Sequence, residues 1–220
     1  MTMPPQLLPL ARRATVAINL NHDGDGTPPA GLWRVVEHAG ADRRGAEAFI
    51  VRSYARAFGA RVQAFTPRLF TLRDADGVVC GAFGLRSAHQ RLFSERYLPV
   101  PMEAAIASGS GERVRRDGIV EVAHLCGGFP GAMRLLIELL AQRLQDEGFE
   151  WVAFTGTAAL RNAFARVGLN PVDLGPACVD CLAVDEREQW GGYYEHRPRV
   201  SAGRIEVGVR AFARCDGDAA

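Results

Sequence analysis

The sequence predicts an α/β (α+β) fold, with one mixed sheet that is antiparallel at its centre and helices on both faces. Three observations indicate it. Strand-like and helix-like segments follow the order strand, helix, three strands, helix, strand, helix, strand. Strands therefore outnumber helices, which disfavours a doubly wound parallel sheet. The first two of the three consecutive strands are separated by a short turn, as in a hairpin.

The first half of the chain contains five predicted elements. A strand covers residues 32–38, a helix 43–59, two strands are LFTLR and VVCGAFGLR around the turn DADG, and a partly helical insertion covers 92–107. In the first helix, Phe49, Ile50 and Tyr54 are spaced to share one face. This helix is therefore expected to pack on the sheet through that face.

The second half continues the alternation of strands and helices. We predict a strand at 118–125, a helix at 131–147, a strand WVAFTGT, a helix LRNAFARVGL, a strand CVDCLAV and one more strand at GRIEVGV. Gly148 and Gly168 follow the two helices, and glycine is the common residue at this position. The longer helix has an apolar stripe typical of core packing, formed by Met133, Leu136, Ile137, Leu140 and Leu144.

Composition excludes several classes of protein. With 48% hydrophobic and 23% charged residues, the chain has ordinary globular composition. Its net charge of +1 gives no bulk electrostatic reason to bind nucleic acid or an anionic membrane, and no nucleic-acid partner is expected. All 26 basic residues are arginines, so lysine chemistry such as a Schiff base is excluded. The sequence contains no run of 18 apolar residues, so no transmembrane helix is predicted.

The expected organisation is a single domain. Residues 1–30 read as a flexible segment with loop chemistry, residues 31–213 as the domain, and residues 214–220 as a tail. Five cysteines without a repeated spacing disfavour a disulfide framework, and the start of the chain lacks a convincing export signal. We therefore expect a cytoplasmic protein. The pair Cys178 and Cys181 lacks two further zinc ligands, so no metal site is expected.

Glu121 interrupts a strand whose two faces are otherwise apolar. Alternation places it on the face of Leu125, with His124 on the other face. One interpretation is a structural ion pair with one of the many arginines, such as Arg115 or Arg116. The other is a general base that lines a cleft at the end of the strand. His124 is open to the same two interpretations, as a second base or a core histidine.

The elbow after this strand is rich in glycine. Gly127, Gly128 and Gly131 precede the helix and carry no side-chain bulk. Free N–H groups at a helix N-terminus favour a bound phosphate or other anion. The elbow is therefore a candidate anion site.

Four stretches together resemble the thermostable hemolysin family. They are EVAHLCGGFPGAMRLLIELL, WVAFTGTAALRNAFARVGLNP, LFSERYLPVPMEAAI and WGGYYEHRPRV, and the resemblance covers most of residues 33–207. The family name implies membrane lysis. The pattern also resembles the GNAT acyltransferase fold, and its strand glutamate is similar to that of acyl-homoserine-lactone synthases. The resemblance implies a GNAT-like sheet in which the Glu121 strand splays from WVAFTGT.

In such a fold the gap between the splayed strands holds the pantetheine arm of an acyl thioester. The resemblance thus implies acyl-CoA or acyl-phosphopantetheine as donor substrate, with no permanently bound cofactor. A backbone N–H near Leu125 or Cys126 would polarise the thioester carbonyl. The implied donor-binding residues are Leu125, Cys126, Gly127, Gly128, Gly131, Ala132, Met133 and Arg134.

Two departures from the pattern concern the donor. Gly127, Pro130 and Ala132 stand where acetyl-CoA-dependent GNAT enzymes usually have a Gln or Arg, a Gly, and a Gly or Ala. Phe164 stands where many of them have a tyrosine that protonates the leaving thiolate. Both departures favour an acyl carrier protein as partner. An acidic carrier could meet the arginines of this region, which could equally be solvated surface: Arg113, Arg115, Arg116 and Arg134.

The expected function is transfer of an acyl group from a thioester to a small-molecule amine, with Glu121 as the catalytic base. Cys126 has two interpretations: it is either a catalytic nucleophile or an unreactive buried thiol. The expected acceptor-binding residues are His124, Thr155, Asn162, Trp190, Tyr193 and Tyr194. The rival hypothesis is a membrane-active or non-catalytic binding protein. Residues 92–107 are the best candidate segment for a membrane anchor in that case. Aminoacyl transfer from tRNA is a third hypothesis, which the near-neutral charge disfavours.

Overall fold

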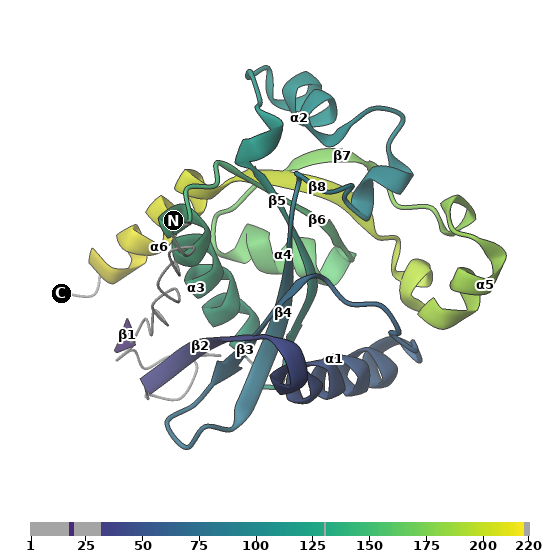
Figure 1. Cartoon of the computed structure of the whole chain (residues 1–220). Helices are drawn as coiled ribbons and strands as arrows, with labels where there is room; N and C mark the ends of the chain where they lie inside the picture. Colours follow the sequence, from purple (N-terminus) through teal and green to yellow (C-terminus); the bar gives the residue numbers. More distant parts are fainter. Residues whose placement is uncertain (1–17, 20–31, 130, 218–220) are drawn as a thin grey trace, which may run out of the picture.

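The sheet has eight strands in the computed structural model, which describes residues 18–19, 32–129 and 131–217 (Figure 1). The strands are β1 (Ile18–Asn19), β2 (Leu32–His38), β3 (Arg68–Arg73), β4 (Val79–Ser87), β5 (Ile119–Gly127), β6 (Trp151–Gly156), β7 (Val172–Pro176) and β8 (Arg199–Arg204). Their order is β1-β2-β3-β4-β5-β6-β8-β7, and among these strands each neighbouring pair is antiparallel except β5 and β6. The predicted mixed sheet is confirmed. The flexible segment expected at 1–30 lies outside the described residues, apart from β1.

Helices cover both faces of the sheet (Figure 1). They are α1 (Arg43–Phe58), α2 (Met102–Ser110), α3 (Ala132–Asp146), α4 (Ala158–Arg166), α5 (Val184–Arg187) and α6 (Ile205–Gly217). Phe70 and Phe83 pack in one core with Leu136 of α3, whereas the adjacent Leu69 packs in another with Ile50 of α1. Neighbouring strand residues point to opposite faces. Helices α1 and α3 therefore lie on opposite sides of the sheet.

Short 3-10 turns connect several elements: Gly40–Asp42, Ser94–Tyr97, Arg116–Gly118, Val179–Cys181, Glu188–Trp190 and Tyr193–His196. The predicted insertion at 92–107 contains one of these turns and most of α2. Met102 and Ile106 of α2 are buried in a core with Ile119 of β5. This segment is therefore part of the domain core on the α1 side of the sheet.

Two predicted strands are wrong. CVDCLAV forms the turn Val179–Cys181 and the start of α5, and the strand beside it is β7. The prediction failed because the edge strand β7 pairs with β8, a long-range contact that local pattern does not reveal. GRIEVGV ends β8 and begins α6, whose buried residues Ile205 and Phe212 are seven apart, as on one helix face. Helix α6 runs to Gly217, beyond the boundary at 213.

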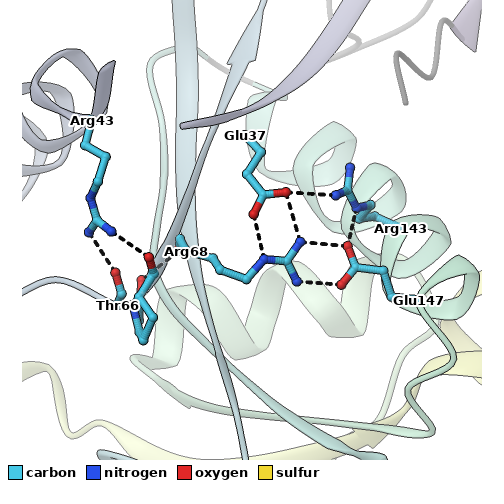
Figure 2. A network of polar contacts seen from close by, with 7 residues as sticks. Glu37, Arg43, Thr66, Arg68, Arg143 and Glu147 are labelled. Atoms are coloured by element: carbon cyan, nitrogen blue, oxygen red, sulfur yellow. Dashed lines mark hydrogen bonds and ion pairs between the residues drawn. The ribbon is translucent and has the colours of Figure 1, made fainter. Parts of the chain in front are cut away.

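An ion-pair network fixes the C-terminal end of α3 on the sheet (Figure 2). The Arg68 guanidinium donates hydrogen bonds to Glu37 of β2 at 2.6 and 3.0 Å and to Glu147 at 2.6 and 2.9 Å. Arg143 donates to the same two carboxylates. Bidentate pairs of this kind fix direction as well as distance. The network therefore helps to set where the other end of α3 meets β5.

Candidate active site

Strands β5 and β6 separate within the sheet. Their parallel pairing runs from Ile119–Trp151 to Val122–Phe154 and ends there, although β5 continues to Gly127. A cavity of about 790 Å³ occupies the region beyond the last pair. Its lining includes Cys126, Met133, Ile137, Leu160, Phe164 and Arg56. The splay that the family resemblance implied is therefore present, with an apolar cavity attached to it.

A β-bulge lies in β5 at the start of the splay. Ala82 of β4 is opposite Cys126, but Gly84 is opposite Ala123, so His124 and Leu125 together face one residue of β4. His124 has φ of 57°, in the left-handed region that non-glycine residues rarely adopt. The extra residue reverses the alternation of side chains along the strand.

The bulge corrects one prediction from the sequence. Leu125 packs against the α3 core and Cys126 against the α1 core. Glu121 and His124 were expected on opposite faces, but both line the same cavity of about 120 Å³. Two titratable side chains are therefore brought together where simple alternation would separate them.

This smaller cavity has an aromatic wall. The rings that line it belong to Tyr54, Phe65, Phe93, Tyr97, Trp190, Tyr193 and Tyr194. It shares part of its lining with the larger cavity, namely Tyr54, Val122, Ala123, His124, Thr155 and Tyr193. The buried Thr155 Oγ1 makes no hydrogen bond within the described part of the chain. The two cavities thus adjoin at His124 and Thr155.

Glu121 is buried, with 3% of its surface exposed, and its carboxylate is held by the segment before α2. It accepts hydrogen bonds from the Phe93 N–H at 2.9 Å, the Ser94 N–H at 2.7 Å and the Ser94 hydroxyl at 2.6 Å. The nearest guanidinium is that of Arg86, at 3.9 Å. Glu121 therefore anchors residues 93–94 to the middle of the sheet.

Glu121 does pair with an arginine, Arg86, but not with Arg115 or Arg116, the two partners suggested from the sequence. Arg115 pairs with Asp117 at 2.5 Å, and Arg116 pairs with Glu95 at 2.6 Å. The sequence could not reveal Arg86 as the neighbour, because it comes from β4 through the antiparallel register with β5.

The His124 ring packs against those of Tyr54 and Phe65, with centroid distances of 6.3 and 5.6 Å. Its ring makes no hydrogen bond to any described residue. Burial, and to a smaller extent the positive charge of Arg86, together lower the pKa of His124 to about 4. The imidazole is therefore neutral at physiological pH and has a free ring nitrogen.

The buried neutral His124 makes stability depend on pH. Its pKa is about 4 in the folded protein and near the ordinary 6.5 when unfolded, so the unfolded state binds the extra proton. The contribution is complete above about pH 6.5 and is lost as the pH falls toward 4. We expect urea denaturation to show wild type losing up to about 3 kcal/mol over this window relative to His124→Asn. Parallel stability curves for the two proteins would contradict this expectation.

The glycines of the elbow between β5 and α3 are needed for close packing and for backbone hydrogen bonds within the protein. The Gly128 N–H donates to the Cys80 carbonyl at 2.8 Å, and a Cβ on Gly127 would lie 2.8 Å from the Cβ of Ala132. The N–H of Ala132 donates to the Phe129 carbonyl. Gly131 has φ of 87° at the start of α3. The amides of Gly128 and Ala132 are thus already used, which leaves fewer N–H groups for a phosphate than the sequence suggested.

The other predicted site residues are divided between the cavities and the surface. Leu125, Cys126, Gly127 and Met133 line the larger cavity, and Trp190 and Tyr194 the smaller one. Arg134 is exposed, and Asn162 lies on the exposed side of α4 and lines neither cavity. The role of Asn162 in acceptor binding stays a prediction, for which neither cavity offers support.

Burial raises the pKa of the Cys126 thiol to about 11, so it is not a ready thiolate nucleophile.

Among the described residues, no three His, Cys, Asp or Glu side chains are grouped as metal ligands. In the same part of the chain, none of the helices combines the length and apolar character needed to span a bilayer.

The sequence pattern of the thermostable hemolysin family matches residues 36–209. The chain belongs to the thermostable hemolysin family. No curated protein matches the sequence. One solved structure with a similar fold is apo TofI, with 13% identity, 80% of this chain and 95% of that chain covered, and a TM-score of 0.53.

Two further solved structures are similar to this thermostable hemolysin family member. FeeM, an N-acyl amino acid synthase from uncultured soil microbes, has 14% identity, coverage of 80% and 93%, and a TM-score of 0.51. MesI, a CoA-dependent acyl-homoserine lactone synthase, has 14% identity, coverage of 84% and 95%, and a TM-score of 0.50. At this identity the likeness establishes the fold, which is the GNAT-like fold that the sequence predicted.

Proposed function

We propose that this protein is an N-acyltransferase that moves an acyl group from a pantetheine thioester to an amine. The observation that carries the proposal is the pair of adjoining cavities on the two sides of the β5 bulge. A two-substrate transfer needs the electrophile and the nucleophile held in contact, and such positioning can supply roughly 7 to 11 kcal/mol of the barrier. The names of FeeM and MesI, both acyl-transferring synthases, agree with this reaction class.

The thioester donor is assigned to the larger cavity. The splay between β5 and β6 is open to the pantetheine arm, and the side chains of α3 and α4 provide an apolar place for the acyl chain. The carbonyl oxygen would take a hydrogen bond from a backbone N–H near Leu125 or Cys126, where pairing with β6 has ended. Phe164 contributes an apolar ring here, which is tilted by 33° against that of Phe154 with 4.8 Å between the ring centroids.

Fewer arginines are available to bind an acidic acyl carrier protein than the sequence suggested. Arg115 and Arg116 have carboxylate partners within the domain, so neither needs an acidic partner protein. Arg56 lines the larger cavity and Arg134 is exposed at the start of α3. A donor phosphate would meet these two arginines first, whether it belongs to CoA or to a carrier protein.

The amine is assigned to the smaller cavity. As its nitrogen attacks the carbonyl, a C–N bond forms and the nitrogen becomes positive and acidic. We assign its proton to the neutral imidazole of His124, and the C–S bond then breaks to release the thiolate. Because the attacking nitrogen has become positively charged and acidic at that stage, a base with a low pKa is sufficient.

Glu121 was the base predicted from the sequence, and that role stays a prediction. Both of its oxygens already accept hydrogen bonds from the 93–94 segment. Taking a proton would cost at least part of that anchoring. We therefore assign Glu121 the positioning of this segment and of Arg86.

Membrane lysis, which the family name implies, has no support in the 92–107 segment. Its apolar side chains Leu92, Met102 and Ile106 are buried in the core, and the exposed Val100 does not by itself form an outward apolar face. An anchor in the plane of a membrane needs such a face.

The proposal is tested by intact mass spectrometry with panels of acyl-CoA and acyl-carrier-protein donors, with and without an amine mixture. We expect amine-dependent consumption of at least one thioester and an acylated amine product. The preferred donor then decides between CoA and a carrier protein. Absence of turnover with every donor, together with leakage of dye from liposomes, would replace the proposal by a membrane activity.

A further inference from the structure

Arg86 lies in a polar site, but the N–H donors of its guanidinium form no hydrogen bond with the described residues. It comes from β4, directly opposite Glu121 in the antiparallel register. Its side chain is 24% exposed, and its ion pair with Glu121 is 3.9 Å long. No hydrogen bond from its guanidinium reaches any described residue. A guanidinium has five N–H donors, so a largely buried one is expected to find acceptors.

The neighbouring groups do not supply those acceptors. The Glu121 oxygens are occupied by Phe93 and Ser94. Glu186, which lines the same cavity, is paired with Arg96 at 2.8 Å. Arg96 also stacks on Phe93, with 4.1 Å between the guanidinium carbon and the ring centroid. Arg96 is thus satisfied within the protein, whereas Arg86 is not.

The charges around this region leave a positive excess. Arg86 lines both the 120 Å³ cavity and an adjacent cavity of about 330 Å³. The charged residues that line the two are Arg61, Arg86, Arg91, Arg96, Glu121 and Glu186. Four positive and two negative side chains leave an excess of two positive charges. The site therefore favours a ligand that carries a negative group.

His124 and Arg86 both line the cavity of about 120 Å³. An amine that reaches His124 can therefore place a group attached to it on Arg86. The smaller cavity, of about 120 Å³, has the volume of roughly four water molecules at ~30 Å³ each, which suits a compact group. A planar carboxylate matches the fork of a guanidinium with two parallel hydrogen bonds.

We infer that the acceptor is an amino acid, whose amine lies at His124 and whose carboxylate is bound by Arg86. The inference rests on the proposed function, because it names the acceptor class of the same site. It also gives a role to Thr155 Oγ1, the buried hydroxyl without a hydrogen bond at the place where the cavities adjoin. That oxygen is available to the acceptor amine.

The test compares acceptors that differ only by the carboxylate. Alanine is paired with ethylamine and leucine with 3-methylbutylamine, and kcat/KM for the acylated product is measured by mass spectrometry. We expect wild type to favour each amino acid about 10- to 100-fold, the effect of charge-assisted hydrogen bonds. Arg86→Gln should bring this ratio close to one, and Arg86→Lys should retain part of it because lysine cannot form the bidentate pair.

Arg115→Gln is the matched control, because Arg115 is exposed and lines neither cavity. It should keep the wild-type ratio. Equal kcat/KM for the two members of each pair in wild type would overturn the inference, and so would an equal loss for both in Arg86→Gln. Should Arg86→Gln fail to fold, the wild-type ratio and Arg86→Lys decide alone.

Saturation-transfer NMR without any donor separates this inference from the proposed function. If no acceptor is acylated, the proposed function fails. The inference then stands only if alanine binds more tightly than ethylamine in wild type and loses that preference in Arg86→Gln. Equal binding of alanine and ethylamine would overturn it, as would a preference for phosphoethanolamine over both.

Discussion

Replacing His124 by asparagine should lower kcat for amine acylation by about 10² to 10⁴-fold, the usual effect of removing a general base. Asparagine suits the position because it tolerates the left-handed backbone, which His124 adopts with φ of 57°. It keeps hydrogen-bonding atoms but cannot take a proton at neutral pH. The substitution therefore removes the base with little demand on the fold.

The measurement is single-turnover acylation with the preferred thioester, followed across pH. His89→Asn is the matched control, because His89 is exposed and lines none of the three cavities. It should retain wild-type kcat. A His124→Asn enzyme with unchanged kcat and a pH profile like that of wild type would show that the imidazole does not accept the proton.

Replacing Glu121 by alanine should lower the free energy of unfolding by about 3 to 5 kcal/mol, the range for breaking a buried charged interaction. The change leaves the N–H groups of Phe93 and Ser94 without an acceptor and removes the partner of Arg86. Urea denaturation measures the loss. Glu188→Ala is the control, since Glu188 is exposed, and we expect it to change stability by less than about 0.5 kcal/mol.

Glu121→Gln separates anchoring from catalysis. Its amide oxygen can still accept a hydrogen bond from the 93–94 segment, so the loss of stability should be smaller than for alanine. Near-normal stability with a kcat reduced as far as in His124→Asn would make Glu121 the base, as the sequence suggested. An alanine variant as stable as the Glu188→Ala control would refute the anchoring role.

The sequence predicted correctly those features that depend on residues close together in the chain. The helical stripe that includes Leu136 and Leu140 follows from periodicity, and Gly148 and Gly168 after α3 and α4 follow from backbone conformation over a few residues. CVDCLAV failed for the opposite reason: its apolar alternation is matched by no partner strand, and both of its cysteines are exposed. Strand formation is decided by the neighbours that a segment meets.

The candidate site was predictable only in part. The sequence singled out Glu121, His124, Tyr193 and Tyr194, which line the smaller cavity. It missed Arg86, because nothing near residue 86 in the chain shows that the residue opposite is Glu121. Tyr54 was assigned only to helix packing, although it lines both cavities.

By itself the sequence determined the class of fold, the family resemblance and the presence of a carboxylate in a central strand, since each depends on residue type and spacing. The tertiary structure decided how those residues act together. A single extra residue in β5 turns His124 to the side of Glu121, and the register with β4 places Arg86 beside both. These outcomes depend on pairing between strands that are distant in the chain, and pairing energy is set by contacts that no local window of sequence contains.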